Sequence, residues 1–241
     1  MKMKIIKQHL KLFTRFEISL WLFSIVTLVL AFLVSGTNYF NLATSLIGVT
    51  ALIYLAKGEP IGQVLSALFS IVYAIASYSF NYYGEMITYL AMTLPSSLFA
   101  TYIWFRHPHK KGATQVQIVP LNLRKILFIM LVSPLVTLAF YFVLKSLVTP
   151  NLIFSTISIA TSIVASLLTF FRSRYYALAY ALNDIILIVL WSLAASVNIS
   201  YLPLVICFVI FLINDLYAFY NWKRLADKQN THTILKEYNY E

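Results

Sequence analysis

The chain has 241 residues, of which 61% are hydrophobic and only 11% are charged. A soluble globular domain is typically about 45–50% apolar and about 25% charged, so the composition excludes a soluble protein and requires lipid as the main solvent. The net charge of +10 does not indicate nucleic-acid binding, because the basic residues stand between apolar runs. The single cysteine, Cys207, excludes a disulfide framework and a thiolate metal site within one chain, and we expect no metal or cofactor.

Eight apolar runs follow one another along the chain. Each is close to the length of about 20 residues that a helix needs to cross a bilayer of about 30 Å. The runs are continuous rather than alternating, which favours helices over the strands of a membrane barrel. The sequence therefore predicts an all-α, multi-pass protein of the cytoplasmic membrane. The predicted spans are residues 18–37, 39–56, 61–80, 83–105, 126–147, 152–171, 175–197 and 201–222.

The basic residues predict the orientation of these spans. The N-terminal tail, the loops after the second, fourth and sixth spans, and the C-terminal tail together hold 17 of the 18 Lys and Arg residues. Only Lys145, near the end of the fifth predicted span, falls on the other side. Because Lys and Arg concentrate in cytoplasmic loops, we expect both termini in the cytoplasm.

The sequence contains a weak internal repeat. Residues 73–104 and 191–222 share seven identical positions at an offset of 118, and both segments end in L-x-A-x-Y-x-W. One linking helix would give two three-helix units the same orientation, as in the parallel repeats of SWEET-like transporters. The expected organisation is a basic tail with an extra helix (1–38), a first repeat (39–105), a cytoplasmic loop with the linking helix (106–150), a second repeat (151–222) and a cytoplasmic tail (223–241).

Three acidic residues lie within the predicted spans: Glu85, Asp184 and Asp215. A charged side chain at mid-membrane costs roughly 2.5–3.5 kcal/mol on insertion scales, so it usually faces a cavity or a partner. No Lys or Arg lies at comparable depth, so no buried ion pair is expected for these acids. The alternative role for polar residues in spans is hydrogen bonding between helices, which is the more common one for Ser and Thr.

The seventh span carries the most informative face. Its Tyr176, Tyr180, Asn183, Asp184 and Trp191 fall within about 100° of one another around the helix. Aromatic platforms beside an amide and a carboxyl group suit a planar ring that carries hydroxyls or an amide. We therefore expect these five side chains to bind a small polar solute.

Polar stripes on other spans match this face. Span eight carries Asn214, Tyr217 and Asn221, and the offset of 118 pairs Ser66 of span three with Asp184. Span four carries a polar stripe made of Glu85, Thr88, Ser96 and Phe99. Pro95 of the same span is a candidate hinge, and Trp104 follows near the end of the span. We expect the two halves to face each other across a polar cavity. The predicted substrate-binding residues are Tyr176, Tyr180, Asn183, Asp184, Trp191, Asn214, Tyr217, Asn221, Gln63 and Ser66.

Several segments in order resemble the PnuC family of nicotinamide riboside transporters, over roughly residues 42–224. They are L-I-Y-L-A-K-G-E at 52–59, Y-Y-G-E at 82–85, Pro95 with Trp104, R-Y-Y at 174–176 with Tyr180 and Asn183–Asp184, and F-L-I-N-D-L-Y-A-F-Y-N-W at 211–222. The resemblance implies a SWEET-like 3+1+3 bundle with an extra N-terminal helix, a homotrimer, and facilitated diffusion that becomes one-way when the substrate is phosphorylated in the cytoplasm.

One position pair departs from the family pattern. Members carry W-x-x-W before the Asn or Asp of span seven, and these positions are Ala177 and Tyr180 here. The resemblance implies that those indoles contact the substrate ring, so thiamine, riboflavin or deoxynucleosides remain alternative substrates. A proton-coupled carrier and a non-transporting membrane scaffold are further alternatives. No catalytic motif indicates an enzyme.

Overall fold

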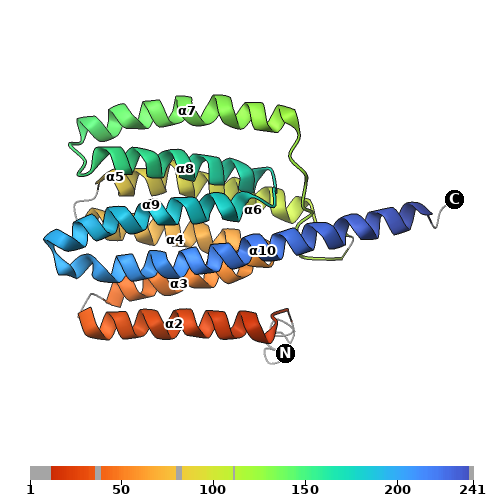
Figure 1. Ribbon diagram of the computed structural model, residues 1–241, viewed down its shortest axis with the longest axis horizontal. Helices are drawn as coiled ribbons and strands as arrows, with labels where there is room; N and C mark the ends of the chain where they lie inside the picture. The colour runs from red at the N-terminus through yellow and green to blue at the C-terminus, as the bar shows by residue number, and fades with distance from the viewer. Residues whose placement is uncertain (1–11, 36–38, 80–82, 111, 239–241) are drawn as a thin grey trace.

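The computed structural model describes residues 12–35, 39–79, 83–110 and 112–238. Within these ranges eight helical segments are long and apolar enough to cross a membrane, which confirms the predicted number of spans. They lie side by side in one bundle (Figure 1). The helical elements are α2 (Arg15–Ser35), α3 (Tyr39–Ala56), α4 (Pro60–Ser79), α5 (Tyr83–Thr88), the π-helical turn η1 (Tyr89–Thr93), α6 (Leu94–Arg106), α7 (Leu123–Ser146), α8 (Leu152–Phe170), α9 (Tyr176–Val197), the 3₁₀ turn η2 (Ile199–Tyr201) and α10 (Leu202–Tyr238).

Several helix ends differ from the predicted limits, and two of the differences have a clear local reason. Helix α2 begins at Arg15 rather than at residue 18 because Thr14 and Glu17 form a capping box. The Thr14 N–H donates to Glu17 Oε2 at 2.6 Å, and the Glu17 N–H donates to Thr14 Oγ1 at 3.3 Å. Helix α10 continues to Tyr238 rather than ending at residue 222, since residues 223–238 contain no Gly or Pro to stop it.

The fourth span is not a uniform α-helix. Pro95 has no N–H, so it cannot make the i to i−4 hydrogen bond of an α-helix. The turn before it is π-helical, and the Leu94 N–H donates to the Tyr89 carbonyl across it. A π-helical turn holds an extra residue, so α6 is rotated relative to a straight continuation of α5. Phe99, expected on the face of Glu85 and Thr88, is consequently 65% exposed while those two are buried.

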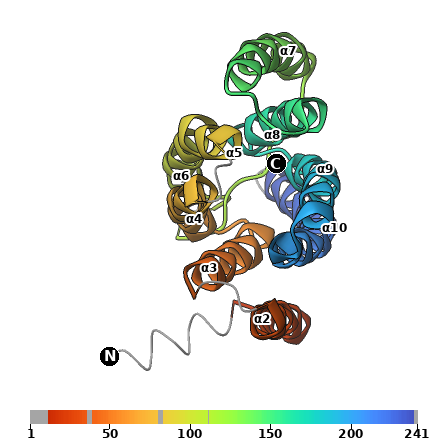
Figure 2. The ribbon, with the colours of Figure 1, turned by 90° about the vertical axis from the view of Figure 1, so that its left-hand side faces the viewer.

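Six spans form a closed ring when the bundle is viewed along its helices (Figure 2). The neighbours around the ring are α3, α4, α6, α8, α9 and α10, and α10 packs back against α3. The other two spans lie outside it, α2 against α3 and α10, and α7 against α8. Only 6% of the apolar part of α7 is buried, against 50% for α4 and α9, so α7 is the span most open to lipid.

Candidate functional site

A cavity of about 90 Å³, with a largely apolar wall that includes polar side chains, lies inside the ring of six helices, and we call it the central cavity. Residues from α3, α4, the fourth span, α8, α9 and α10 all contribute to its wall. Helices from before and after α7 therefore meet at this cavity. The residues that line it are Gly48, Ala51, Leu52, Leu55, Gln63, Ser66, Phe69, Tyr89, Thr93, Ser97, Ser162, Tyr180, Asn183, Asp184, Leu187, Phe208, Phe211 and Asp215.

Helix α9 presents an oriented amide to the central cavity. The Oδ1 atom of Asn183 accepts hydrogen bonds from Ser158 Oγ at 3.1 Å and from Thr161 Oγ1 at 2.8 Å, both on α8. These two donors fix the carbonyl side of the amide. The amino group of Asn183 is therefore the donor that this residue offers to a ligand.

The next residue on α9 presents an unsatisfied carboxyl group. Asp184 is 4% exposed, and its Oδ2 atom is buried with no hydrogen-bond partner among the described residues. The carboxyl group of Asp215, which is 3% exposed, lies close enough on α10 to interact with it. A buried polar atom without a partner costs free energy, so this pair of acids is the least satisfied polar group of the cavity wall.

Aromatic rings cover the apolar part of the central cavity. The centroid of Phe69 lies 5.9 Å from that of Tyr89 and 5.7 Å from that of Phe211, and Phe211 lies 5.6 Å from Phe208. Tyr180 adds a fifth ring from α9. These spacings are those of packed aromatic pairs, so the rings form one continuous apolar part of the wall.

Three predicted site residues lie away from the central cavity, near the end of α3 or beside α4. Tyr176 Oη donates to the Leu55 carbonyl at 3.0 Å, and Asn221 Nδ2 donates to the Ala56 carbonyl at 2.7 Å. These carbonyls belong to the last turn of α3, where the helix itself provides no donor. Trp191 lines a separate space of about 20 Å³ that also borders Tyr73.

The two remaining predicted residues connect α10 to α2. Asn214 Nδ2 donates to Ser24 Oγ at 3.2 Å, and Tyr217 Oη donates to Glu17 Oε1 at 2.6 Å. The polar stripe of span eight thus faces the extra N-terminal helix rather than the inside of the ring. Of the ten predicted residues, the central cavity brings together Gln63, Ser66, Tyr180, Asn183 and Asp184.

Sequence reasoning left Asp215 out of the predicted set although it lines the central cavity. Asp215 follows Asn214 directly, and neighbours in a helix point about 100° apart, so Asp215 lies off the stripe of Asn214, Tyr217 and Asn221 that the prediction followed. The available signal was the acid itself, since an unpaired acid within a span favours a cavity. The aromatic wall gave no signal in the sequence, because Phe69, Phe208 and Phe211 resemble ordinary apolar residues of a span.

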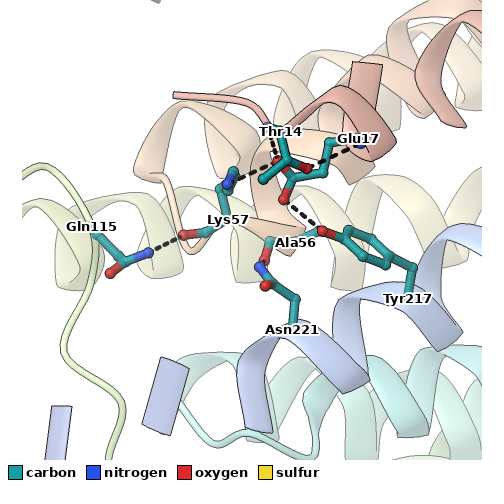
Figure 3. Close-up of polar contacts among 7 residues, drawn as sticks. All are labelled: Thr14, Glu17, Ala56, Lys57, Gln115, Tyr217 and Asn221. Carbon is teal, nitrogen blue, oxygen red and sulfur yellow. Dashed lines mark hydrogen bonds and ion pairs between the residues drawn. The ribbon is translucent and has the colours of Figure 1, made fainter. Parts of the chain in front are cut away.

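A second polar cluster, which we call the α2 anchor, joins Thr14, Glu17, Lys57 and Tyr217 (Figure 3). Lys57 Nζ lies 2.8 Å from Glu17 Oε2, and Glu17 is 1% exposed. Gln115, from the loop before α7, donates to the Lys57 carbonyl at 2.8 Å. The sequence did not indicate this ion pair, because Glu17 stood in the predicted N-terminal tail.

The region that matches a family model begins next to α3 and ends within α10, so it contains the helices of the ring. The model of the family described as nicotinamide mononucleotide transporter matches residues 38–224. A nicotinamide riboside transporter PnuC of Neisseria mucosa is 26% identical over 223 residues, which cover 90% of this chain and 84% of that protein. A nicotinamide riboside transporter PnuC of Haemophilus influenzae is 21% identical over 216 residues, covering 89% and 92%.

A solved structure has the same fold. The crystal structure of the vitamin B3 transporter PnuC superposes with a TM-score of 0.78 at 23% sequence identity, over 90% of this chain and 94% of that chain. The match extends beyond the ring, since 90% of this chain includes more than the six ring helices. The all-helical arrangement described above is therefore that of a known membrane transporter.

Proposed function

Because the chain belongs to the nicotinamide mononucleotide transporter family, we propose that it carries nicotinamide riboside across the cytoplasmic membrane through the central cavity. The observation that carries this proposal is the set of polar side chains inside the ring, where Asn183 and Asp184 line the same cavity as Gln63 and Ser66, and where Asp184 Oδ2 has no hydrogen-bond partner among the described residues. Carboxyl and amide groups at this depth are costly and usually face a cavity or a partner. The names of the relatives supply the substrate.

The wall of the central cavity fits the parts of a pyridine nucleoside. The aromatic faces of Tyr180 and Phe69 suit the ring, and Asn183 offers a donor to the carboxamide. Gln63 and Ser66 suit the hydroxyl groups of a ribose. The family carries Trp at the positions of Ala177 and Tyr180. Ala177 is fully buried in the core, so only Tyr180 of these two is left to contact a substrate.

The transport cycle requires the ring to open. A volume of about 90 Å³ is smaller than the roughly 300 Å³ at which ligand pockets begin, so substrate entry needs outward movement of ring helices. The π-helical turn at Tyr89–Thr93 lines the cavity and breaks the regularity of the fourth span, which makes it the natural hinge. We propose facilitated diffusion, with phosphorylation in the cytoplasm preventing return.

The same proposal includes a topology and an assembly. The closed ring supports a SWEET-like 3+1+3 arrangement in which α3, α4 and α5–α6 form one repeat, α8, α9 and α10 form the other, and α7 links them. The distribution of Lys and Arg supports cytoplasmic termini. A homotrimer follows from the resemblance, and α7 and α2 lie outside the ring where neighbouring copies could pack.

Uptake by reconstituted protein tests this function. Purified full-length chain in liposomes is expected to take up labelled nicotinamide riboside saturably, without a proton gradient and without a kinase. Unlabelled nicotinamide riboside competes, whereas riboflavin and deoxynucleosides compete weakly. Uptake that requires the gradient would instead support a proton-coupled carrier, and the absence of saturable binding of any small solute would support a scaffold.

A second substrate is favoured by one observation, the replacement of the two expected indoles by Ala177 and Tyr180. A smaller aromatic surface would accept another ring, and thiamine is the alternative that best suits the acidic wall. Competition by thiamine at lower concentration than nicotinamide riboside would assign the chain to that substrate.

A further inference from the structure

The ionisable groups of the central cavity all have the same sign. Asp184 and Asp215 line it from α9 and α10, and none of the described lining residues is Lys, Arg or His. Both acids are at least 96% buried, and Asp184 Oδ2 is without a hydrogen-bond partner in the described part of the chain. A buried acid is stabilised by an opposite charge, and the protein supplies none here.

Aromatic rings surround these acids. Phe69, Tyr89, Tyr180, Phe208 and Phe211 all border the same cavity. A cation over the face of an aromatic ring is attracted by the ring quadrupole, and more strongly where water is excluded. Rings and carboxyl groups together, with no base nearby, are the arrangement by which proteins hold organic cations.

We propose that Asp184 and Asp215 act as a charge filter that selects a ring with a fixed positive charge. The filter accepts a pyridinium or a thiazolium ring, and it rejects a neutral ring of the same shape and a phosphorylated nucleoside. This inference rests on the proposed function and narrows its substrate class. Nicotinamide riboside and thiamine satisfy the filter, whereas riboflavin and deoxynucleosides do not.

Binding to the purified full-length chain tests the filter with three probes. Nicotinamide riboside carries the charge, benzamide riboside is its neutral carbon-ring counterpart, and nicotinamide mononucleotide adds a phosphate. We expect benzamide riboside to bind at least about tenfold more weakly than nicotinamide riboside, as loss of a desolvated cation–π contact and of a charge partner implies. We expect nicotinamide mononucleotide to bind at least about tenfold more weakly as well, because its phosphate has the same sign of charge as the two acids and meets no Lys, Arg or His among the described lining residues.

Charge-removing variants locate the filter. In Asp184→Asn and Asp215→Asn the preference for nicotinamide riboside over benzamide riboside is expected to fall below about threefold, with the melting temperature unchanged or raised. Glu85→Gln is the matched control, because Glu85 is also a buried acid within a span but does not line the cavity. It is expected to keep the preference.

The outcomes separate the filter from the proposed function. Equal affinity of the wild-type chain for nicotinamide riboside and benzamide riboside overturns the filter and leaves the transport proposal standing. Binding of thiamine but not of nicotinamide riboside overturns the proposed substrate and supports the filter. Binding of neither cation overturns both. An unaltered preference in both Asn variants overturns the assignment to Asp184 and Asp215, and the wild-type comparison is decisive even where a variant fails to fold.

Discussion

The chain buries acidic side chains at the α2 anchor and in the central cavity, and it surrounds them differently. Glu17 of the α2 anchor meets Lys57 Nζ at 2.8 Å, Tyr217 Oη at 2.6 Å and the Thr14 N–H at 2.6 Å. Asp184 of the central cavity is buried to a similar degree but has one oxygen without a partner in the described structure. Partners, more than burial, therefore distinguish the acid of the α2 anchor from the acid that we propose to bind a ligand.

The strongest test of this contrast is Asp184→Ala. Uptake of nicotinamide riboside is expected to fall at least about a hundredfold, because a charged contact in a dry site is worth roughly 3 kcal/mol or more. The melting temperature is expected to stay the same or rise, since removing an unpaired buried acid relieves a cost. Initial uptake rates in liposomes and a thermal melt in detergent measure both. Normal uptake by this variant would remove Asp184 from the site.

The reverse pattern is expected at the α2 anchor with Lys57→Met. This change leaves Glu17 buried without its cation and should destabilise the fold by about 2–3 kcal/mol, somewhat less than for a fully buried pair because Lys57 is 18% exposed. Adding Glu17→Gln should recover part of the loss. Thermal melts of both variants measure this, and an unchanged melt for Lys57→Met would show that the pair contributes nothing. Substrate affinity of the folded variant is expected to match the wild type.

Tyr217→Phe decides between two roles for a residue that the sequence assigned to the substrate. In the structure Tyr217 donates to Glu17, so its loss should cost about 1–2 kcal/mol of stability and leave the KM for uptake unchanged. Tyr180→Phe is the matched control at the cavity wall, with the opposite expectation of a raised KM at near wild-type stability. A raised KM with an unaltered melt for Tyr217→Phe would restore it to the binding site.

The smallest expected effect comes from Thr161→Val, which keeps the shape of the side chain. It removes one of the two donors that orient the Asn183 amide, at 2.8 Å, so we expect the KM to rise about threefold to tenfold at unchanged maximal rate. Thr156→Val on the same helix is the control, because Thr156 donates to the Leu152 carbonyl of its own helix and, within the described part of the chain, to no side chain of α9. Equal effects of the two variants would mean that Asn183 needs no orientation.

The sequence predicted the spans well because each is set by its own residues. A run of apolar side chains about 20 residues long has to be buried in lipid whatever surrounds it. Asn183, Asp184 and Tyr180 could be predicted to lie on one face for a similar reason, because the polar face of α9 is visible in the residues of that span alone. The start at Arg15 was also readable in principle, because Thr14 and Glu17 carry the capping-box spacing.

The rest depended on neighbours that no single helix specifies. Asn214 and Tyr217 form a clear polar stripe, but its direction is set by α2, which packs on α10 from outside the ring. Tyr176 and Asn221 looked like ligand contacts and instead satisfy carbonyls at the end of α3, far away in the sequence. A polar face is visible in a sequence, whereas the partner it faces is a property of the packed bundle.

The π-helical turn of the fourth span holds one residue more than a regular helical turn. Deleting one residue from Tyr89–Thr93 would allow a regular helix, and the residues after it would point as they do now, because the wide turn already takes up the extra residue. Trp104, now 0% exposed, would stay buried, and Phe99 would stay exposed. We therefore expect the fourth span of related transporters to tolerate a single-residue deletion at this turn, and their alignments should allow a gap there.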